Sequence, residues 1–335
     1  MSKENESESG EDRLIARYFK PLATHPGALG LVDDAAAIAP PAGCDLVLTV
    51  DGIVGGVHFF PDDPPDTVAR KALRVNLSDL AAKGAKPLGF LLTLALPKEI
   101  GDAWLAPFAR GLGADADFFG CPLFGGDTDR TPGPITISIA VFGAVPHGRM
   151  VRRSGAVPGD RVVVTGTVGD AALGLLQRRN PAAAGRWGLT RGQSDHLAAR
   201  YLVPEPRNAI AEFLGNYASA AMDVSDGLAG DLAKLCRASD VAAEIEVARV
   251  PLSEAARTVI AKEPALIETI VTGGDDYEVL ACVPAGKLDE FRHKSSAAGV
   301  AVTEIGHVVA GHGTARFLGR DGKPLALAHP SFSHF

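Results

Sequence analysis

The sequence predicts an α/β protein of two domains. The chain has 335 residues, which is enough for two domains of ordinary size. Apolar residues make up 46% of the chain, so each domain can bury a sizeable core. Alanine, glycine and valine are plentiful and aromatic residues make up only 6%, a composition that fits an α/β protein better than a disulfide scaffold or a coiled coil.

Apolar periodicity and glycine positions predict the elements of the N-terminal half. Leu73, Leu77 and Leu80 fall on one face of a helix, Gly84 follows where a C-cap glycine belongs, and Pro87 comes next. The predicted helices cover residues 12–19, 67–83 and 102–112, and the predicted strands cover residues 45–51, 90–96 and 135–145. Helices and strands therefore alternate through this half.

A stretch rich in Gly, Pro and Arg over residues 147–159 predicts the domain boundary. We expect a disordered acidic leader over 1–11, an N-terminal α/β domain over 12–148 and a C-terminal α/β domain over 149–335. The elements predicted in the second domain are strands 161–165 and 277–283, helices 170–179, 206–214 and 228–237, and a surface loop 180–193.

Charge and cysteine content exclude several functional classes. The net charge is −7 and no Lys/Arg-rich run occurs, so nucleic-acid binding through a basic patch is not expected. The four cysteines form no C-x-x-C pair, which predicts reduced thiols in a reducing compartment. The N-terminus lacks a signal-peptide pattern, and apolar runs such as 90–96 are too short to span a membrane. We therefore expect a cytoplasmic protein with no membrane partner.

Aspartates gather at the ends of the predicted apolar segments, beside Gly, Ser or Thr, where loops commonly bear functional side chains. They are Asp33, Asp34, Asp51, Asp79, Asp127, Asp129, Asp223, Asp226, Asp275 and Asp276. Carboxylate oxygens favour Mg²⁺ or Ca²⁺ over Zn²⁺. Because like charges brought together repel unless a cation compensates them, the set predicts a site for divalent metal ions.

Each aspartate taken alone also has a structural interpretation. Asp51 precedes a glycine and can be part of a plain turn after a strand. Asp226 or the preceding Ser225 can be the N-cap of the next helix. Asp79 can pair with Lys83 one helical turn later, and the pair at 33–34 can lie in a solvated loop. Only the combination points to metal binding.

Six short motifs occur in a fixed order along the chain. They are DGIVGGVHF (51–59), NLSDLAAKGA (76–85), GGDT (125–128), RSGAVPGD (153–160), DVSDGL (223–228) and GGDDYE (273–278). Any one would be a weak indication, but the ordered set is specific. It resembles the motif set of thiamine-monophosphate kinases over nearly the whole chain, from about residue 11 to the C-terminus.

The resemblance implies a fold shared with aminoimidazole-ribonucleotide synthetases, selenophosphate synthetases and a hydrogenase-maturation protein. Each subunit would consist of two α/β domains, and the N-terminal sheets of two subunits would pair in a homodimer. ATP would bind in a cleft near this interface. The implied activity is transfer of the terminal phosphate of ATP to thiamine monophosphate, with several Mg²⁺ ions and thiamine diphosphate as the product.

The resemblance also implies roles for individual residues, by their place in the motifs. The implied metal ligands are Asp34, Thr49, Val50 (through its carbonyl), Asp51, Asp79, Asp127, Asp223 and Asp226. The implied ATP contacts are Gly126, Asp127, Arg153 and Ser225. The implied contacts to the thiamine phosphate are His58, Asp275 and Phe332.

The sequence departs from the family pattern at four places. Val32 replaces a glycine of a Gly-rich turn, and Val50 replaces a threonine that would offer a hydroxyl ligand. The segment after GGDT is longer and more acidic because of Asp129. Asp275 stands where the family has Glu, so the carboxylate at this implied substrate contact is one methylene shorter.

The implied chemistry suits these residue types. Both substrates are anionic, so carboxylates can bind them only through cations such as Mg²⁺. Phosphoryl transfer then depends on positioning and charge neutralisation, and the acceptor is already an oxyanion. We therefore assign no general base. His58 is expected to bind rather than to take a proton, and Arg153 either neutralises the triphosphate or is a surface residue beside Arg152.

Other functions stay open at this point. The chain contains no G-x-x-x-x-G-K-[ST], no H-R-D or D-F-G set, and no G-x-G-x-x-G after a strand, so the common nucleotide-binding motifs are absent. An enzyme of the same fold could use another small acceptor. A non-catalytic protein could bind thiamine phosphates, and a divalent-cation buffer is a third possibility.

Overall fold

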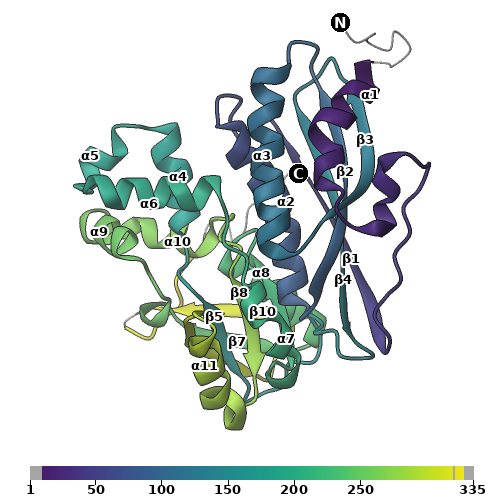
Figure 1. Ribbon diagram of the computed structural model, residues 1–335. Helices are drawn as coiled ribbons and strands as arrows, with labels where there is room; N and C mark the ends of the chain where they lie inside the picture. Colours follow the sequence, from purple (N-terminus) through teal and green to yellow (C-terminus); the bar gives the residue numbers. More distant parts are fainter. Residues whose placement is uncertain (1–9, 320, 328–335) are drawn as a thin grey trace, which may run out of the picture. The chain divides into compact units, whose positions relative to one another are not determined.

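The computed structural model describes residues 10–319 and 321–327, which form two compact units. The first unit consists of residues 10–76 and 87–144, and the second of residues 77–86 together with the described residues from 145 onward. Residues 1–9 of the predicted leader and the predicted substrate contact Phe332 lie outside the described residues. Each unit is an α/β structure with its own sheet, as Figure 1 shows.

In the described part of the first unit, four strands form a sheet in the order β1-β4-β2-β3. Their bounds are Cys44–Val54 (β1), Thr136–Pro146 (β4), Lys86–Leu96 (β2) and Leu123–Arg130 (β3). β2 and β3 run parallel, with Leu92 opposite Gly126 and Thr93 opposite Asp127. Burial alternates along β4, where Ile137 is fully buried, as expected of a sheet with one face on the core.

Helices cover the buried face of this sheet. They are α1 (Gly10–Leu14), continued by the π-helical turn η1 (Ile15–Phe19), the 3₁₀ turns η2 (Lys20–Leu22) and η3 (Pro26–Leu31), α2 (Pro65–Ala82) and α3 (Asp102–Phe119). Arg74 of α2 forms a two-point ion pair with the buried Asp115 of α3, at 2.5 and 2.9 Å. At Gly111 of α3 an added Cβ would lie 2.4 Å from the backbone oxygen of Asp66, so the two helices approach closely there.

In the described part of the second unit, six strands form a sheet in the order β10-β7-β9-β5-β8-β6. Their bounds are Thr314–Leu318 (β10), Ala242–Glu246 (β7), Val302–Val309 (β9), Arg161–Thr165 (β5), Val279–Val283 (β8) and Ala220–Asp223 (β6). β7 and β10 are parallel, and the other neighbouring strands are antiparallel. Both faces are buried: Val162 and Val164 of β5 contribute to one apolar core, and Val163 contributes to the other.

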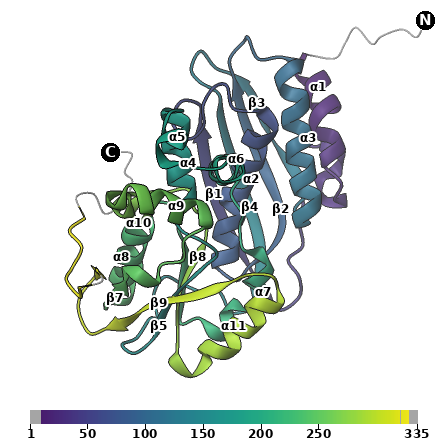
Figure 2. The same ribbon diagram turned by 90° about the vertical axis from the view of Figure 1, so that its left-hand side faces the viewer.

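The two cores of this unit lie under different helices (Figure 2). One core is covered by α4 (Asp170–Arg179), α5 (Ala183–Trp187), α6 (Arg191–Leu202), α8 (Leu228–Ser239), α9 (Glu254–Lys262) and α10 (Ile267–Thr272). The other is covered by α7 (Asn208–Tyr217) and α11 (Leu288–Ala297). The 3₁₀ turns η4 (Val247–Arg249), η5 (Pro264–Leu266) and η6 (Ala285–Lys287) connect these elements.

Most predicted elements are confirmed, but the loop predicted over residues 180–193 is wrong. The stretch 180–193, predicted as a surface loop, contains α5 and the start of α6, and Trp187 within it is only 1% exposed. The GGDT motif (125–128), over which no strand was predicted, lies within β3. Burial of the large apolar side chain of Trp187 stabilises α5, although the local composition suggests a loop.

No helix in the described residues is long and apolar enough to cross a membrane. All four cysteines fall among the described residues and are free thiols. Burial raises the pKa of Cys121 to about 12 and that of Cys236 to about 11, so these thiols stay protonated and unreactive at neutral pH.

Candidate functional site

A cavity of about 840 Å³ in the first unit brings together part of the predicted site. Its polar lining includes Asp33, Asp34, Gly126 and Asp127, and its apolar lining includes Phe124. Asp34 follows η3 in sequence, whereas Asp127 is on β3, so the fold places two predicted metal ligands from distant segments on one cavity. The described lining residues do not include the other three predicted ligands of this unit, Thr49, Val50 and Asp51.

Position 126 requires glycine because there is no room for a Cβ atom. A Cβ there would lie 1.8 Å from the backbone oxygen of Leu92 on the neighbouring strand. The β2–β3 register shifts between Phe90 and Leu91, which marks a bulge just before this close approach. The glycine thus lets β3 run against β2 while the next residue, Asp127, remains exposed on the cavity.

The departure at Val32 causes no backbone strain. Val32 has φ −117°, a conformation open to any residue. The left-handed conformations of this turn are instead adopted by Leu29 (φ 52°), Gly30 (φ 63°) and Leu31 (φ 55°). The replacement of glycine by Val32 is therefore compatible with this turn, because the left-handed conformations fall on the residues before it.

The middle of β1 carries three predicted ligands, Thr49, Val50 and Asp51. The backbone N–H of Asp51 donates to the side-chain oxygen of Asn76 at 2.9 Å, and the buried Asn76 donates in turn to the carbonyl of Ala72. Val50 is 61% exposed on an apolar face of β1, so only its carbonyl could serve as a ligand.

The ring of His58 is held by the last residue of β1, Val54. Its Nδ1 accepts a hydrogen bond from the backbone N–H of Val54 at 3.0 Å, and its carbonyl accepts one from Lys71. Because Nδ1 is an acceptor, the neutral ring keeps its proton on Nε2. Such a ring donates a hydrogen bond through Nε2, which supports a binding role over that of a general base.

In the second unit, Asp223 at the end of β6 is the most strongly perturbed of the predicted ligands. It is 4% exposed and accepts a hydrogen bond from the hydroxyl of Ser78 at 2.9 Å. Burial, and then the negative charge of Asp79, raise the pKa of Asp223 to about 8. Lys83 donates to the carbonyl of Ala221, and burial lowers its pKa to about 8. The positive charge of the exposed Arg153 contributes to this lowering.

The turn after β6 is organised by Asp231, which the sequence analysis did not identify. One carboxylate oxygen of the fully buried Asp231 accepts from the backbone N–H groups of Ser225 and Asp226, at 3.0 and 2.9 Å. The other oxygen pairs with Lys234, which also pairs with Asp226. The N-cap of α8 is Gly227, so the interpretation of Ser225 or Asp226 as the cap is wrong. Burial raises the pKa of Asp231, and Lys234 opposes that rise.

The segment that contains Asp275 lies directly against this turn. The N–H of Asp275 donates to the carbonyl of Ser225 at 2.9 Å, and the N–H of Tyr277 donates to that of Val224 at 2.8 Å. A Cβ at Gly274 would lie 2.4 Å from the Ser225 oxygen, so this approach requires glycine. A predicted substrate contact and a predicted ATP contact are thus neighbours.

This segment has an unusual backbone. Asp275 and Tyr277 have φ values of 72° and 52°, which are uncommon for residues other than glycine. Each such conformation costs roughly 1–3 kcal/mol and persists only where the surrounding structure enforces it.

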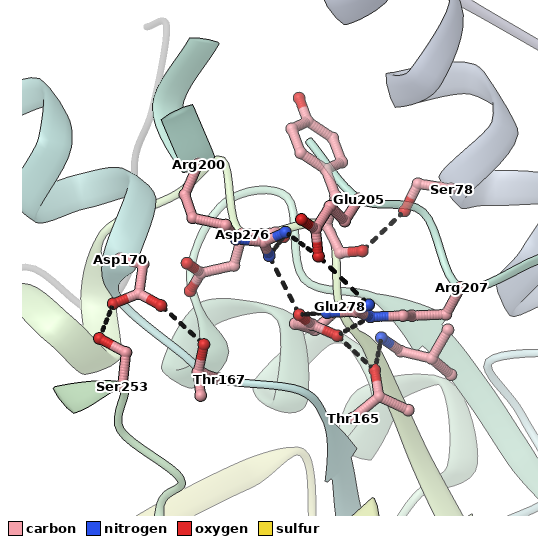
Figure 3. Close-up of polar contacts among 12 residues, drawn as sticks. Ser78, Thr165, Thr167, Asp170, Arg200, Glu205, Arg207, Ser253, Asp276 and Glu278 are labelled. Carbon is pink, nitrogen blue, oxygen red and sulfur yellow. Dashed lines mark hydrogen bonds and ion pairs between the residues drawn. The ribbon is translucent and has the colours of Figure 1, made fainter. Parts of the chain in front are cut away.

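A buried ionic network, also missed by the sequence analysis, involves Asp276 and Glu278 of the same segment (Figure 3). Glu278 is fully buried and contacts Arg200, Arg207 and the hydroxyl of Thr165. Asp276, also fully buried, accepts from the backbone N–H of Gly169 at 2.7 Å. Acidic residues at 276 and 278 were visible in the GGDDYE motif, but nothing in the sequence indicated that the two arginines pair with them.

A Mg²⁺ site is not complete within the described residues, where no group of three or more His, Cys, Asp or Glu side chains could hold a metal ion. The parts nevertheless suit a divalent cation. Asp34 and Asp127 offer only oxygen ligands to one cavity, and the mutual repulsion of Asp79 and Asp223 would be relieved by a bound cation.

Comparison with known proteins identifies relatives of the whole chain. The model of the N-terminal domain of AIR synthase related proteins matches residues 32–145, and that of the C-terminal domain matches residues 157–319. A thiamine-monophosphate kinase of Caulobacter vibrioides is 42% identical over 93% of this chain and 88% of its own. That of Escherichia coli K12 is 39% identical over 97% of this chain and 98% of its own.

Solved structures give the same picture. The thiamine-monophosphate kinase of Stenotrophomonas maltophilia superposes with a TM-score of 0.82, at 35% identity, over 94% of this chain and 96% of its own. AaThiL, solved in complex with AMPPCP and TMP, gives a TM-score of 0.76 at 31% identity, over 92% of this chain and 97% of its own. The hydrogenase maturation protein HypE shares the fold, with a TM-score of 0.78 at 19% identity, over 97% of this chain and 96% of its own.

Proposed function

The chain belongs to the thiamine-monophosphate kinase family of AIR synthase related proteins, and we propose that it transfers the terminal phosphate of ATP to thiamine monophosphate. The products are thiamine diphosphate and ADP. The main support is similarity over nearly the entire length, 93% of this chain at 42% identity, which includes every motif of both units. The complex of AaThiL with AMPPCP and TMP supports the pair of substrates.

The transfer is direct. An oxygen of the acceptor phosphate attacks the γ-phosphorus of ATP, the bond to the bridging oxygen breaks, and ADP leaves. No residue has to remove a proton, because the attacking oxygen is already anionic. His58 donates a hydrogen bond from Nε2 to the acceptor, and Asp275 complements the positive charge of the thiazolium ring. Phe332 completes the acceptor site in this proposal.

We assign the nucleotide to Gly126, Asp127, Arg153 and Ser225. Arg153 is exposed and positively charged, which suits the triphosphate. The backbone at Ser225 is held by Asp231, so a contact from this residue is preorganised. Preorganised donors stabilise developing charge at little cost during the reaction.

Several Mg²⁺ ions belong to the proposal. Their ligands are Asp34, Thr49, the carbonyl of Val50, Asp51, Asp79, Asp127, Asp223 and Asp226. When bound, such ions neutralise phosphate oxygens and orient the reacting groups. The oxygen-only ligand set and the adjacent charges of Asp79 and Asp223 support this choice of metal.

We also propose a homodimer formed through the first unit's sheet. Leu46, Leu48 and Val50 alternate along the edge strand β1 and are 38%, 72% and 61% exposed. An apolar strip on a sheet edge is typical of a surface that another copy covers. Leu48→Glu should convert the dimer to a monomer in analytical ultracentrifugation, and an unchanged mass would contradict this interface.

A cytoplasmic location agrees with the four free thiols.

The decisive experiment is an assay of the purified protein with ATP, Mg²⁺ and thiamine monophosphate. Thiamine diphosphate should accumulate over many turnovers, with one ADP per product, and a chelator should stop the reaction until Mg²⁺ is restored. Thiamine without its phosphate is the control acceptor. Binding of thiamine monophosphate without any product would instead identify a non-catalytic binding protein, and ATP consumption with only another acceptor would identify a different enzyme of this fold.

A further inference from the structure

Three side chains bind the carboxylate of Glu278, although the proposed function assigns Glu278 no contact with ATP, thiamine monophosphate or Mg²⁺. Its carboxylate accepts from the hydroxyl of Thr165 at 2.6 Å and from Arg200 at 3.0 Å. Arg207 adds a two-point ion pair, with its Nε at 2.6 Å from one carboxylate oxygen and its Nη2 bonded to the other. Figure 3 shows Glu278 between the two guanidinium groups. Charge-assisted bonds of this kind fix both the position and the orientation of a carboxylate.

Arg200 connects this carboxylate to the backbone next to Asp275. One of its nitrogens donates to Glu278 and also to the carbonyl of Asp276, at 3.1 Å. The side chain of Asp276 is itself bonded to the N–H of Gly169. The backbone on the C-terminal side of Asp275 is thereby anchored at Asp276 and at Glu278, both of which are fully buried.

Asp275 differs from these neighbours because it is only half-buried. The direction of its side chain follows from the left-handed backbone at Asp275 and Tyr277, which the surrounding contacts must enforce. Loss of the Glu278 network would let this backbone relax and turn the Asp275 carboxylate away from its present direction.

We propose that Glu278, held by Arg200 and Arg207, is a positioning residue that fixes the backbone around Asp275 and so directs the Asp275 carboxylate toward the phosphate acceptor. This inference rests on the proposed function, in which Asp275 contacts thiamine monophosphate. It predicts that loss of Glu278 changes the KM for thiamine monophosphate and leaves the KM for ATP nearly unchanged.

The test is steady-state kinetics of Glu278→Gln, Asp275→Asn and the double variant. Glu278→Gln should raise the KM for thiamine monophosphate about tenfold and change the KM for ATP and kcat by less than about threefold. The double variant should be no worse than Asp275→Asn alone, because both changes remove the same contact. Equal increases in both KM values, or simple addition of the two effects, would overturn the proposal.

Asp115→Asn is the matched control, because it breaks a buried two-point Arg–carboxylate pair in the other unit. It should lower Tm and leave the ratio of the two KM values unchanged. If Glu278→Gln does not fold, Arg207→Lys is the alternative variant, because it keeps the charge and one hydrogen bond. It should raise the KM for thiamine monophosphate about two- to fourfold and leave the KM for ATP nearly unchanged. Absence of turnover in the wild type would refute the proposed function itself, whereas an active wild type with unsplit variants would refute only the role of Glu278.

Discussion

Two aspartates of the first unit differ in burial from two aspartates of the second. Asp34 and Asp127 of the first unit are exposed on a cavity, whereas Asp223 and Asp231 of the second unit are buried within hydrogen-bonded turns. An exposed carboxylate keeps its charge at little cost, but a buried one costs stability unless donors or cations compensate it. Neutralising Asp34 or Asp127 should therefore reduce activity without changing stability, whereas neutralising Asp223 or Asp231 should change both activity and stability.

The largest expected effect is that of Asp127→Asn in the first unit. Loss of one charged metal ligand should reduce kcat/KM by at least about 100-fold, measured with saturating Mg²⁺. Because Asp127 is exposed, Tm should change by no more than about 2 °C. Asp129→Asn on the same strand is the control, since Asp129 is exposed and outside the cavity lining. Equal losses from both variants would contradict the assignment of the cavity.

Asp223→Asn should reduce activity to a similar extent but stabilise the metal-free protein. The folded-state pKa of about 8 lies above the unfolded value of 3.8, so the folded state keeps a proton that the unfolded chain releases. Wild-type stability from this group therefore falls as pH rises from about 4 to about 8. The variant avoids this loss, by about 1–3 kcal/mol at pH 8, and thermal melts in chelator at pH 5 and pH 8 measure it. A lower Tm than wild type at pH 8 would contradict the comparison.

Asp231→Asn should have an intermediate effect on activity. It removes the charge that holds Lys234 and weakens two bonds to the turn at Ser225 and Asp226, so the KM for ATP should rise about fivefold. Stability should fall by about 2 kcal/mol, which urea unfolding can measure. Asp240→Asn, at the exposed C-cap of the same helix, is the control and should change neither quantity.

The smallest effect is expected for Val32→Gly, which restores the family residue. Because Val32 already has an ordinary φ, kcat/KM should change less than about twofold. Stability should fall by about 0.5 kcal/mol through the greater freedom of glycine in the unfolded chain. A large gain in activity would show that the turn beside Asp34 is limited by the valine after all.

Sequence patterns predicted the strongly periodic or apolar elements well. The strand Arg161–Thr165 and the helix Asp170–Arg179 have the predicted bounds. The sequence patterns did not predict β6, because this strand has only four residues, all buried, and shows no alternation. They also failed for 180–193, where glycine and arginine suggested a loop but burial of Trp187 favoured a helix.

By itself the sequence determined which residue types recur in which order, and hence the family, the chemistry and the candidate ligands. Only the tertiary structure decided their electrostatic state, because burial and charge depend on neighbours that are remote in sequence. Ser78 donates to Asp223 from 145 positions away, and the adjacent residues Asp275 and Asp276 differ in that one is half-exposed and the other fully buried. Local sequence specifies the carboxylate, whereas the folded environment sets its pKa and direction.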